Sequence, residues 1–305
     1  MGPTASGKTD LAVEFVKRLG CGIVSVDSAM IYRGMDIGTA KPGPEVLSIA
    51  PHRLIDILDP AEKYSAARFR EDALAAMAEI SASGQVPLLT GGTMLYFDVL
   101  QHGIAALPDA DPTIRAALDQ RAAEEGWPTL HAELARLDPE AAARIQPNDR
   151  QRIQRALEVC YIAKRPLSEL QRAGAVQTGE YRYCKLALAP TERQGLHQAI
   201  ERRFHGMMEQ GFLEEVQRLY ARGDLDLSMP SMRAVGYRQL WEYLQGGVSL
   251  EEAVRRGIVA TRRYAKRQLT WLRAERDVQW YESGARGLAG AACAYATSQL
   301  VASSR

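Results

Sequence analysis

Residues 2–9, with the sequence GPTASGKT, constrain this chain more than any other segment. Their glycines let backbone N–H groups converge on phosphate oxygens, and the start of the helix predicted to follow adds partial positive charge. Lys8 supplies a full charge, and the Thr9 hydroxyl can bind Mg²⁺. The segment predicts a pyrophosphate site without specifying ATP; the alternative is a coincidental turn. The residues predicted to hold the phosphates are Gly2, Thr4, Ala5, Ser6, Gly7, Lys8 and Thr9.

Short β-rich runs follow the loop at residues 22–27, 52–57 and 85–90, a helical pattern lies at 66–81, and another β-rich run lies at 185–189. Strands that alternate with helices predict an α/β fold, a doubly wound parallel sheet like that of P-loop NTPases. A loop of this kind normally follows a buried strand, and only Met1 precedes it. We therefore expect a first strand upstream of the printed sequence.

Strand signals stop between residues 109 and 173, where helical patterns cover 112–125, 127–137, 139–145 and 149–163. This composition predicts an all-helical insertion domain at 109–173 within a core formed by 1–108 and 174–305. Later in the core, 196–222 is predicted to be a long helix interrupted at Gly211, and 250–276 to be helices around Gly257.

The overall composition excludes several classes of protein. With 46% hydrophobic residues and a net charge of +1, the chain is neither disordered nor basic enough for a global attraction to nucleic acid. Its four cysteines include no CxxC pair, so no zinc site or disulfide framework is expected. The sequence has no signal peptide and no long apolar run, which predicts a cytoplasmic protein without a membrane span. Residues 255–276 carry eight basic side chains and one acidic one, a local net charge of +7.

Seven ordered segments between Gly2 and about Trp280 together resemble the tRNA dimethylallyltransferases, in their bacterial form without a C-terminal zinc finger. The segments are GPTASGKT at 2–9, VDSAMIYR at 26–33, DIGTAKP at 36–42, PHRLID at 51–56, GGTMLY at 91–96, SMRAVGYRQ at 231–239 and AKRQ at 265–268. The resemblance implies transfer of a dimethylallyl group from dimethylallyl diphosphate to N6 of adenosine 37 in the tRNA anticodon stem-loop. It also implies that the phosphate loop binds a leaving group.

The resemblance assigns three catalytic residues. Asp27 is expected to take a proton from the adenine amine, although it could instead cap the next turn. Arg203, in the segment IERRF, is expected to contact the departing diphosphate, and Arg202 is the neighbour most easily confused with it. Thr9 is the expected Mg²⁺ ligand. Tyr32, Met94 and Tyr96 could line a prenyl channel, and core packing is an equal alternative.

Basic stretches and the resemblance together predict a tRNA footprint, since a patch of cations is needed to neutralise phosphates. Thr93 and Arg115 enter through the resemblance alone. The predicted tRNA contacts are Asp27, Ser28, Ala29, Met30, Thr93, Arg115, Gln151, Arg152, Ile153, Gln154, Arg155, Arg233, Ala234, Val235, Gly236, Tyr237, Arg238, Lys266, Arg267 and Gln268. The alternative for each charged stretch is a solvated helix face.

Two other function classes stay open. The same phosphate loop would serve a small-molecule kinase or a prenyltransferase acting on free AMP, but neither needs a helical insertion or a basic patch. A non-catalytic RNA-binding module is disfavoured because Lys8, Thr9 and Asp27 are all present. We expect a monomeric enzyme.

Overall fold

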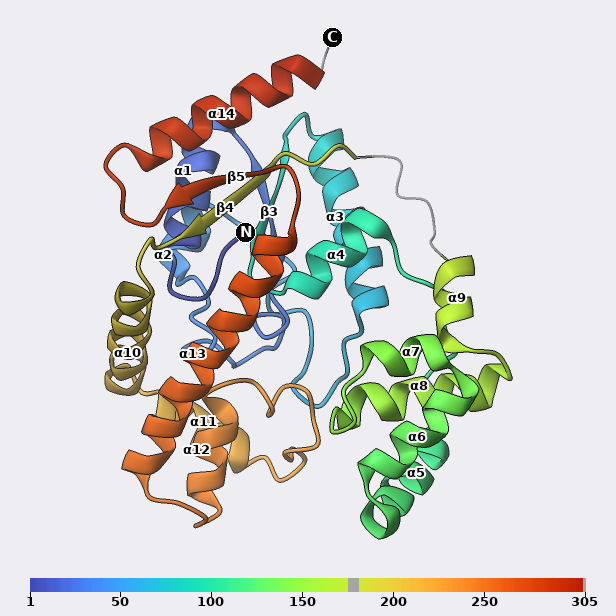
Figure 1. Cartoon of the computed structure of the whole chain (residues 1–305). Coiled ribbons are helices and arrows are strands. Elements are labelled where there is room, and N and C mark those ends of the chain that lie inside the picture. Colours follow the sequence, from blue (N-terminus) through green and yellow to red (C-terminus); the bar gives the residue numbers. More distant parts are fainter. Residues whose placement is uncertain (175–180, 304–305) are drawn as a thin grey trace. The chain divides into compact units, whose positions relative to one another are not determined.

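The computed structural model describes residues 1–174 and 181–303, which form two compact units (Figure 1). The larger comprises Met1–Leu100 and Arg182–Arg305, and the smaller is Gln101–Tyr181. The smaller unit thus begins eight residues before the predicted boundary at 109, because Leu107 packs against its core and the Pro108 carbonyl accepts a hydrogen bond from Arg155. Residues 175–180 and 304–305 of the predicted core lie outside the described residues.

The described strands of the larger unit form two sheets, and the paired strands within each sheet run parallel. The strand β1 (Gly22–Val26) lies between β2 (His52–Arg53) and β3 (Pro87–Gly91), with Ile23 opposite His52 and Leu88. The strands β4 (Lys185–Ala189) and β5 (Val278–Glu282) form a second pair. The predicted strand at 52–57 is wrong beyond Arg53, since Leu54 and Asp56 adopt positive φ angles of 63° and 54° that end the ladder. The strand β5 was not predicted.

The first residues of the chain run beside β4. The Met1 amino group donates to the Leu186 carbonyl at 2.8 Å, and the Met1 carbonyl accepts from the Leu188 amide at 2.9 Å. This is the pattern of a parallel ladder. A side chain on Gly2 would have its Cβ 2.4 Å from the Leu188 carbonyl oxygen, so this close approach requires glycine. The phosphate loop therefore starts near the carboxyl end of β4.

Helices cover both faces of the sheet, as a doubly wound fold requires. Ile23 of β1 packs with Ala12 of α1 (Lys8–Leu19), whereas the next residue back, Gly22, lies against Ile80 of α3 (Ala66–Ala82). Because adjacent strand residues point to opposite faces, α1 and α3 cover opposite sides. They lie on either side of β3 in Figure 1. The predicted α/β fold is confirmed.

The remaining helices of the larger unit follow the sheet. They are α2 (Pro44–Ile49), α4 (Met94–His102), α10 (Arg193–Glu209), α11 (Phe212–Tyr220), α12 (Tyr237–Leu244), α13 (Leu250–Ala274) and α14 (Leu288–Ser303). The predicted interruption at Gly211 is confirmed, with φ 96°. The interruption at Gly257 is wrong: α13 continues through it, and a Cβ there would lie 2.4 Å from the Phe204 ring. Gly257 therefore serves the packing of α10 against α13. No described helix is long and apolar enough to span a membrane.

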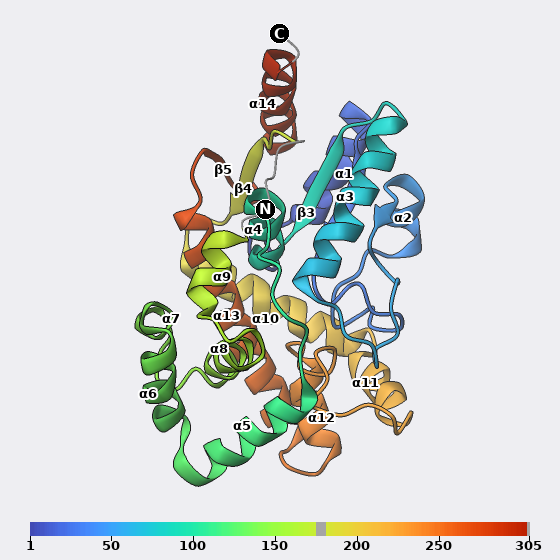
Figure 2. The same cartoon turned by 90° about the vertical axis from the view of Figure 1, so that its right-hand side faces the viewer.

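Helices are the only regular secondary structure in the described part of the smaller unit (Figure 2). Its helices are α5 (Pro112–Glu125), α6 (Trp127–Leu137), α7 (Pro139–Arg144), α8 (Arg150–Ala163) and α9 (Leu167–Ala173). The carboxylates of Asp111, Asp138 and Asp149 accept from backbone amides at the starts of α5, α7 and α8. Leu118, Leu130, Leu134, Ile153 and Leu157 form the centre of its core.

Candidate active site

A cavity of about 390 Å³ opens at the carboxyl edge of β1 and β3. This is the edge at which doubly wound sheets bind ligands. The phosphate loop forms one wall, the turn after β1 forms a second, and α10 and α13 close the remaining side. The lining includes Thr4, Ala5, Lys8, Thr9, Asp27, Gly91, Gly92, Arg203, Arg233 and Arg267.

The phosphate loop curls because two of its residues take left-handed backbone angles. Ala5 has φ 61° and Gly7 has φ 80°, and Gly7 is the N-cap of α1. Ser6 is buried, and its carbonyl accepts from the Ser283 hydroxyl at 3.0 Å, so the tip of the loop is tied to the end of β5. Loop amides and the start of α1 can therefore receive an anion.

Lys8 is the loop's only full charge, and its ammonium donates to the Pro3 carbonyl at 2.6 Å. Burial and the nearby Arg203 lower the pKa of Lys8 to about 8, against the opposing effect of Asp27. Two cations and one carboxylate therefore face each other across the cavity. An anionic ligand placed there would favour the protonated form of Lys8.

The Asp27 carboxylate has a structural task as well as a place in the cavity. Its Oδ1 accepts from the Ala29 amide at 2.9 Å and from the Met30 amide at 3.3 Å. Asp27 therefore caps the turn that follows β1, which was the alternative interpretation of this residue. These hydrogen bonds hold its carboxylate at the cavity wall. Tyr264 of α13 lines the same cavity, and burial together with the Asp27 charge raises the pKa of its phenol to about 12.

Arg203 and Arg202 lie in different environments on α10. Arg203 lines the cavity together with Ile200 and Phe204, whereas Arg202 is exposed and outside it. Burial lowers the pKa of Arg203, and Asp27 opposes this effect. Among the ion pairs of the described residues, none involves Arg203. Its guanidinium is therefore available to a ligand in the cavity.

We expect Arg203→Ala to lower the single-turnover rate of the dimethylallyl transfer that the resemblance implies by about 10²- to 10³-fold, the usual effect of removing one preorganised donor to a developing anion. Arg202→Ala removes the same charge from the same helix and is the matched control. Rapid-quench kinetics with saturating RNA measures both. A silent Arg203→Ala beside a severe Arg202→Ala would contradict the assignment.

Gln268, a predicted tRNA contact, has a structural task within the protein. Its side chain is only 4% exposed, and its Oε1 accepts from the Thr4 amide at 2.9 Å. Its Nε2 donates to the Gly92 carbonyl at 2.7 Å. The amide thus joins the phosphate loop to the end of β3 from α13, and half of its hydrogen-bonding capacity is taken up by the protein itself.

Most other predicted tRNA residues of the larger unit border the cavity. The Thr93 hydroxyl accepts from the Ser28 amide at 3.1 Å. Arg238 pairs with Glu242 at 3.0 Å outside the cavity, Gly236 caps α12, and Lys266 also lies outside it. Those on the lining are Asp27, Ser28, Ala29, Met30, Arg233, Ala234, Val235, Tyr237, Arg267 and Gln268.

In the smaller unit, the structure assigns several predicted tRNA residues to internal contacts. Arg115 and Arg155 both pair with the fully buried Glu158, at 2.8 Å and 2.7 Å. Burial alone would raise the pKa of Glu158, but these two arginines hold it below its usual value. Ile153 is fully buried, so its predicted contact with tRNA is wrong for the side chain. Gln154 bonds to Asp119, and Gln151 and Arg152 remain exposed.

The proposed prenyl-channel residues are divided between core and cavity. Tyr96 stacks on Phe69 with ring centroids 3.9 Å apart, and Met94 is also buried. Neither is among the residues that line the cavity, and both pack in the core. Tyr32 borders the cavity from the core.

Glu215 was not singled out from the sequence. This buried carboxylate accepts from the amides of Asp36, Ile37 and Gly38 at 2.9, 2.8 and 3.1 Å. The Tyr237 hydroxyl also donates to it, at 2.5 Å. Gly38 and Tyr237 line the cavity, so Glu215 holds this wall in place. In the sequence, Glu215 is marked only by its position shortly after Gly211, the glycine that interrupts the helix.

Glu215→Ala leaves three amides and one hydroxyl without an acceptor. We expect it to lower the free energy of unfolding by about 3 kcal/mol, within the usual range for a buried polar group left unpaired. The neighbouring Glu214→Ala, on the solvent side of α11, is the control. Urea unfolding followed by circular dichroism measures both, and equal midpoints would contradict the role of Glu215.

The chain matches the family model described as IPP transferase over residues 30–275. It is 60% identical to a tRNA dimethylallyltransferase of Thioalkalivibrio sulfidiphilus, covering 92% of this chain and 88% of the relative. A protein of the same name from Methylococcus capsulatus is 56% identical, with 94% and 92% covered.

Solved structures agree with this match. The tRNA isopentenylpyrophosphate transferase of Bacillus halodurans is 37% identical with a TM-score of 0.73, covering 99% of this chain and 96% of that one. A eukaryotic dimethylallyltransferase described as acting on tRNA is 23% identical with a TM-score of 0.81, covering 100% of this chain and 78% of that one, and shows a shared fold. The family match, the relatives and the cavity agree, and the chain belongs to the IPP transferase family of tRNA dimethylallyltransferases.

Proposed function

We propose that this protein transfers a dimethylallyl group from dimethylallyl diphosphate to N6 of adenosine 37 in tRNA, releasing diphosphate. The observation that carries the proposal is one cavity in which Lys8 and Arg203 face Asp27. Two cations suit a diphosphate, and a carboxylate suits the proton of an attacking amine. The names of the relatives support the same reaction.

The reaction breaks the allylic C–O bond, and its electron pair leaves with the diphosphate. Lys8, Arg203 and the loop amides stabilise the negative charge that develops there. The N6 nitrogen forms the new bond to carbon, and its proton passes to Asp27. Because the adenine lone pair is delocalised into the ring, the amine is a poor nucleophile without this base.

The chemistry of the site fits Mg²⁺ bound mainly through the donor. No cluster of three or more His, Cys, Asp or Glu side chains suited to a metal exists among the described residues. Mg²⁺ commonly takes one or two protein ligands and completes its shell with phosphate oxygens and water. Thr9 lines the cavity and would hold the ion, which supplies charge neutralisation at the diphosphate.

The RNA must present a single base to the cavity, which requires that base to leave its stack. Arg233 and Arg267 are exposed at the lining, where they can neutralise flanking phosphates. Free AMP would make little use of such a surface. For this reason we favour tRNA over a small nucleotide as acceptor.

Radiolabelled dimethylallyl diphosphate incubated with either bulk tRNA or AMP separates the two acceptors. We expect label in tRNA and none in AMP. A labelled nucleotide formed only from AMP would overturn the proposal, as would phosphoryl transfer from ATP to a small acceptor without any prenyl transfer.

The value of kcat/KM for the donor is expected to fall as pH rises through about 8. Protonated Lys8 binds the diphosphate, and its pKa of about 8 makes it lose this charge in the free enzyme above that pH. Bound diphosphate retains the proton, so kcat at saturating donor should lack this limb. Steady-state pH profiles test this, and an identical limb in kcat would contradict it.

A further inference from the structure

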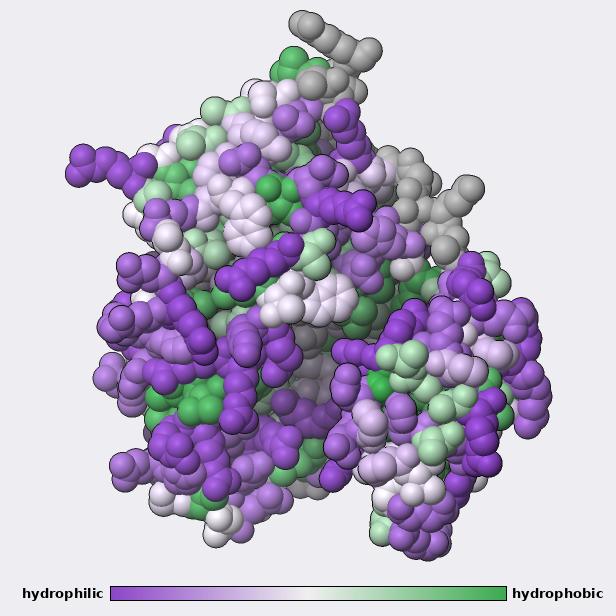
Figure 3. All heavy atoms as spheres, in the orientation of Figure 1, coloured by the Kyte–Doolittle hydropathy of each residue, from purple (hydrophilic) through white to green (hydrophobic). Residues whose placement is uncertain are grey.

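Gln268 differs from its neighbours on α13. Lys266 and Arg267 are exposed, and hydrophilic side chains cover much of the surface over this helix (Figure 3), whereas Gln268 is only 4% exposed. It borders the catalytic cavity. A buried primary amide costs free energy unless its donors and its acceptor find partners. The partners of Gln268 therefore indicate its role.

The amide of Gln268 joins two walls of the catalytic cavity. Its Oε1 accepts from the Thr4 amide in the phosphate loop at 2.9 Å, and its Nε2 donates to the Gly92 carbonyl just after β3 at 2.7 Å. Thr4 and Gly92 both line the cavity. A primary amide offers a donor and an acceptor side by side, whereas a carboxylate at this position would present two acceptors and a leucine neither group. The bridge therefore requires the chemistry of glutamine.

The bridge fits tightly between its partners. A Cβ on Gly92 would lie 2.3 Å from the Nε2 of Gln268 and 3.3 Å from the Gly2 carbonyl oxygen, so this approach requires glycine. A Cβ on Gly91 would lie 2.0 Å from the Val26 carbonyl oxygen at the end of β1. The two glycines thus let the phosphate loop, the turn after β3 and the end of β1 meet. The amide between them has little room to move.

Hydrogen bonds continue from this bridge to the turn that carries Asp27. Gly92 is followed by Thr93, whose hydroxyl accepts from the Ser28 amide at 3.1 Å. Ser28 is the residue directly after Asp27. A continuous path of backbone and hydrogen bonds therefore leads from the Thr4 amide, through the side chain of Gln268, to the backbone beside the Asp27 carboxylate.

Tyr264, one turn before Gln268 on α13, lies at the same junction. Burial, and then the Asp27 charge, raise the pKa of its phenol to about 12, whereas hydrogen bonds with Thr93 and Gln268 act in the opposite direction. The phenol therefore contacts both the bridge and the turn after β3. One face of α13 thus supports both ends of this path.

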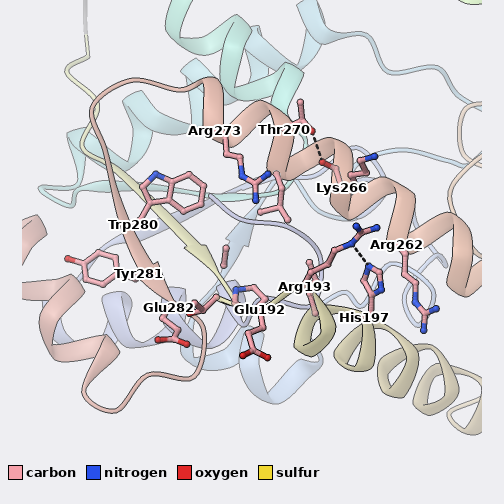
Figure 4. Close-up of a pocket in the computed structure, with 15 residues that line it drawn as sticks. Glu192, Arg193, His197, Arg262, Lys266, Thr270, Arg273, Trp280, Tyr281 and Glu282 are labelled. Carbon is pink, nitrogen blue, oxygen red and sulfur yellow. Dashed lines mark hydrogen bonds between the residues drawn. The ribbon is translucent and has the colours of Figure 1, made fainter.

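The other face of α13 borders a separate cavity of about 560 Å³ beside β4 and β5 (Figure 4). Thr270, two residues after Gln268, lies there, and its hydroxyl donates to the Lys266 carbonyl within the helix at 3.0 Å. Thr270 is exposed and is not among the residues that line the catalytic cavity. Removing its polar group therefore provides a matched control for the same change at Gln268.

We propose that Gln268 is a positioning residue for the transfer reaction. It fixes the phosphate loop, which holds the donor, relative to the turn of Asp27, which receives the proton of the acceptor. This inference rests on the proposed function, since both reactants must meet in this cavity. Rates depend steeply on such alignment, and a misplacement of about 1 Å can cost about 10²-fold. In this role Gln268 touches neither reacting atom and acts through Thr4 and Gly92.

The test compares the single-turnover rate at saturating dimethylallyl diphosphate and tRNA with the Kd for each substrate. Gln268→Leu keeps a similar size and removes both hydrogen bonds. We expect its rate to fall about 10²-fold, while both Kd values change much less, because the loop and the turn persist but lose their alignment. Thr270→Val should match the wild type in all three measurements. A wild-type rate for Gln268→Leu, or a defect confined to a Kd, would overturn the positioning role.

Gln268→Glu supplies a second readout, which decides if Gln268→Leu does not fold. Its ionised carboxylate accepts from the Thr4 amide but repels the Gly92 carbonyl, whereas its protonated carboxyl can serve both. The ratio of its rate to the wild-type rate should therefore rise as the pH falls towards the pKa of this carboxyl, which burial raises above its ordinary value of about 4.3. The other titratable groups of the cavity are common to both proteins and cancel in the ratio; they include Lys8, Asp27, Arg203 and Tyr264.

Circular dichroism at each pH establishes that the samples are folded when their rates are measured. A ratio for Gln268→Glu that does not rise between about pH 8 and pH 5 would overturn the positioning role, because protonation should restore the donor to Gly92. Wild-type transfer to tRNA is measured in parallel. Its absence would overturn the proposed function and the role of Gln268 with it, whereas wild-type activity with unaffected variants would overturn only the role of Gln268.

Discussion

Asp27→Asn is expected to lower the single-turnover rate of transfer by about 10²- to 10⁴-fold, the range that a general base contributes. Asparagine retains a carbonyl oxygen that can accept from the amides of Ala29 and Met30, as Asp27 Oδ1 does at 2.9 and 3.3 Å. The turn after β1 and the shape of the cavity should therefore persist. Only the capacity to take a proton is removed, so tRNA affinity should change little.

Rapid-quench transfer and tRNA binding, measured on the same protein samples, test this expectation. Asp27→Ala is the informative companion, because it removes the cap together with the base. Capping residues contribute about 1 kcal/mol, so we expect Asp27→Ala alone to lower the stability measurably. If Asp27→Asn lost tRNA binding in proportion to its lost rate, Asp27 would be an anchor for the nucleotide rather than a base.

Lys8→Ala should lower kcat/KM for the donor by at least about 10²- to 10³-fold, since the loop then has no full charge to meet the diphosphate. The effect should appear in donor affinity and in kcat. Diphosphate is already charged in the ground state, and it gains further charge in the transition state. The fold should persist, because among the described residues the Lys8 ammonium donates only to the Pro3 carbonyl within its own loop.

Lys17→Ala on the exposed side of α1 is the matched control for this change. Donor binding by equilibrium titration and turnover at saturating donor separate the two parts of the effect. Unchanged turnover of Lys8→Ala at saturating donor and Mg²⁺ would refute a role for Lys8 in the transition state. Unchanged donor affinity would show that Lys8 does not contribute to binding of the donor in the ground state.

The sequence predicted those features that depend on local pattern. The loop at 2–9 and α1 behind it follow from glycine placement and helical spacing, and the predicted strands at 22–27, 85–90 and 185–189 match β1, β3 and β4. Arg203 could be assigned only through the resemblance, since spacing alone does not separate it from Arg202. The structure distinguishes them through the face of α10 that each occupies.

Long-range contacts explain what the sequence could not reveal. The Oε1 of Gln268 accepts a hydrogen bond from the amide of Thr4, 264 residues away in the sequence. From the sequence alone, Gln268 could not be distinguished from the other polar residues of its basic stretch. Glu215 binds amides of a loop nearly 180 positions earlier. From the sequence, Gly257 was interpreted as a helix breaker. Its packing role depends on a contact with Phe204 of another helix, which only the structure shows. Ile153 fell within a predicted footprint although its side chain belongs to the core of the smaller unit.

Mass spectrometry of nucleosides from tRNA tests the proposed reaction most directly. Unmodified tRNA is incubated with dimethylallyl diphosphate, Mg²⁺ and either the wild-type protein or Asp27→Asn, and is then digested. We predict one added dimethylallyl group on adenosine 37 with the wild type and only a trace with the variant over the same time. An unmodified adenosine 37 with the wild-type protein, or a prenyl group on another nucleotide, would contradict the proposed function.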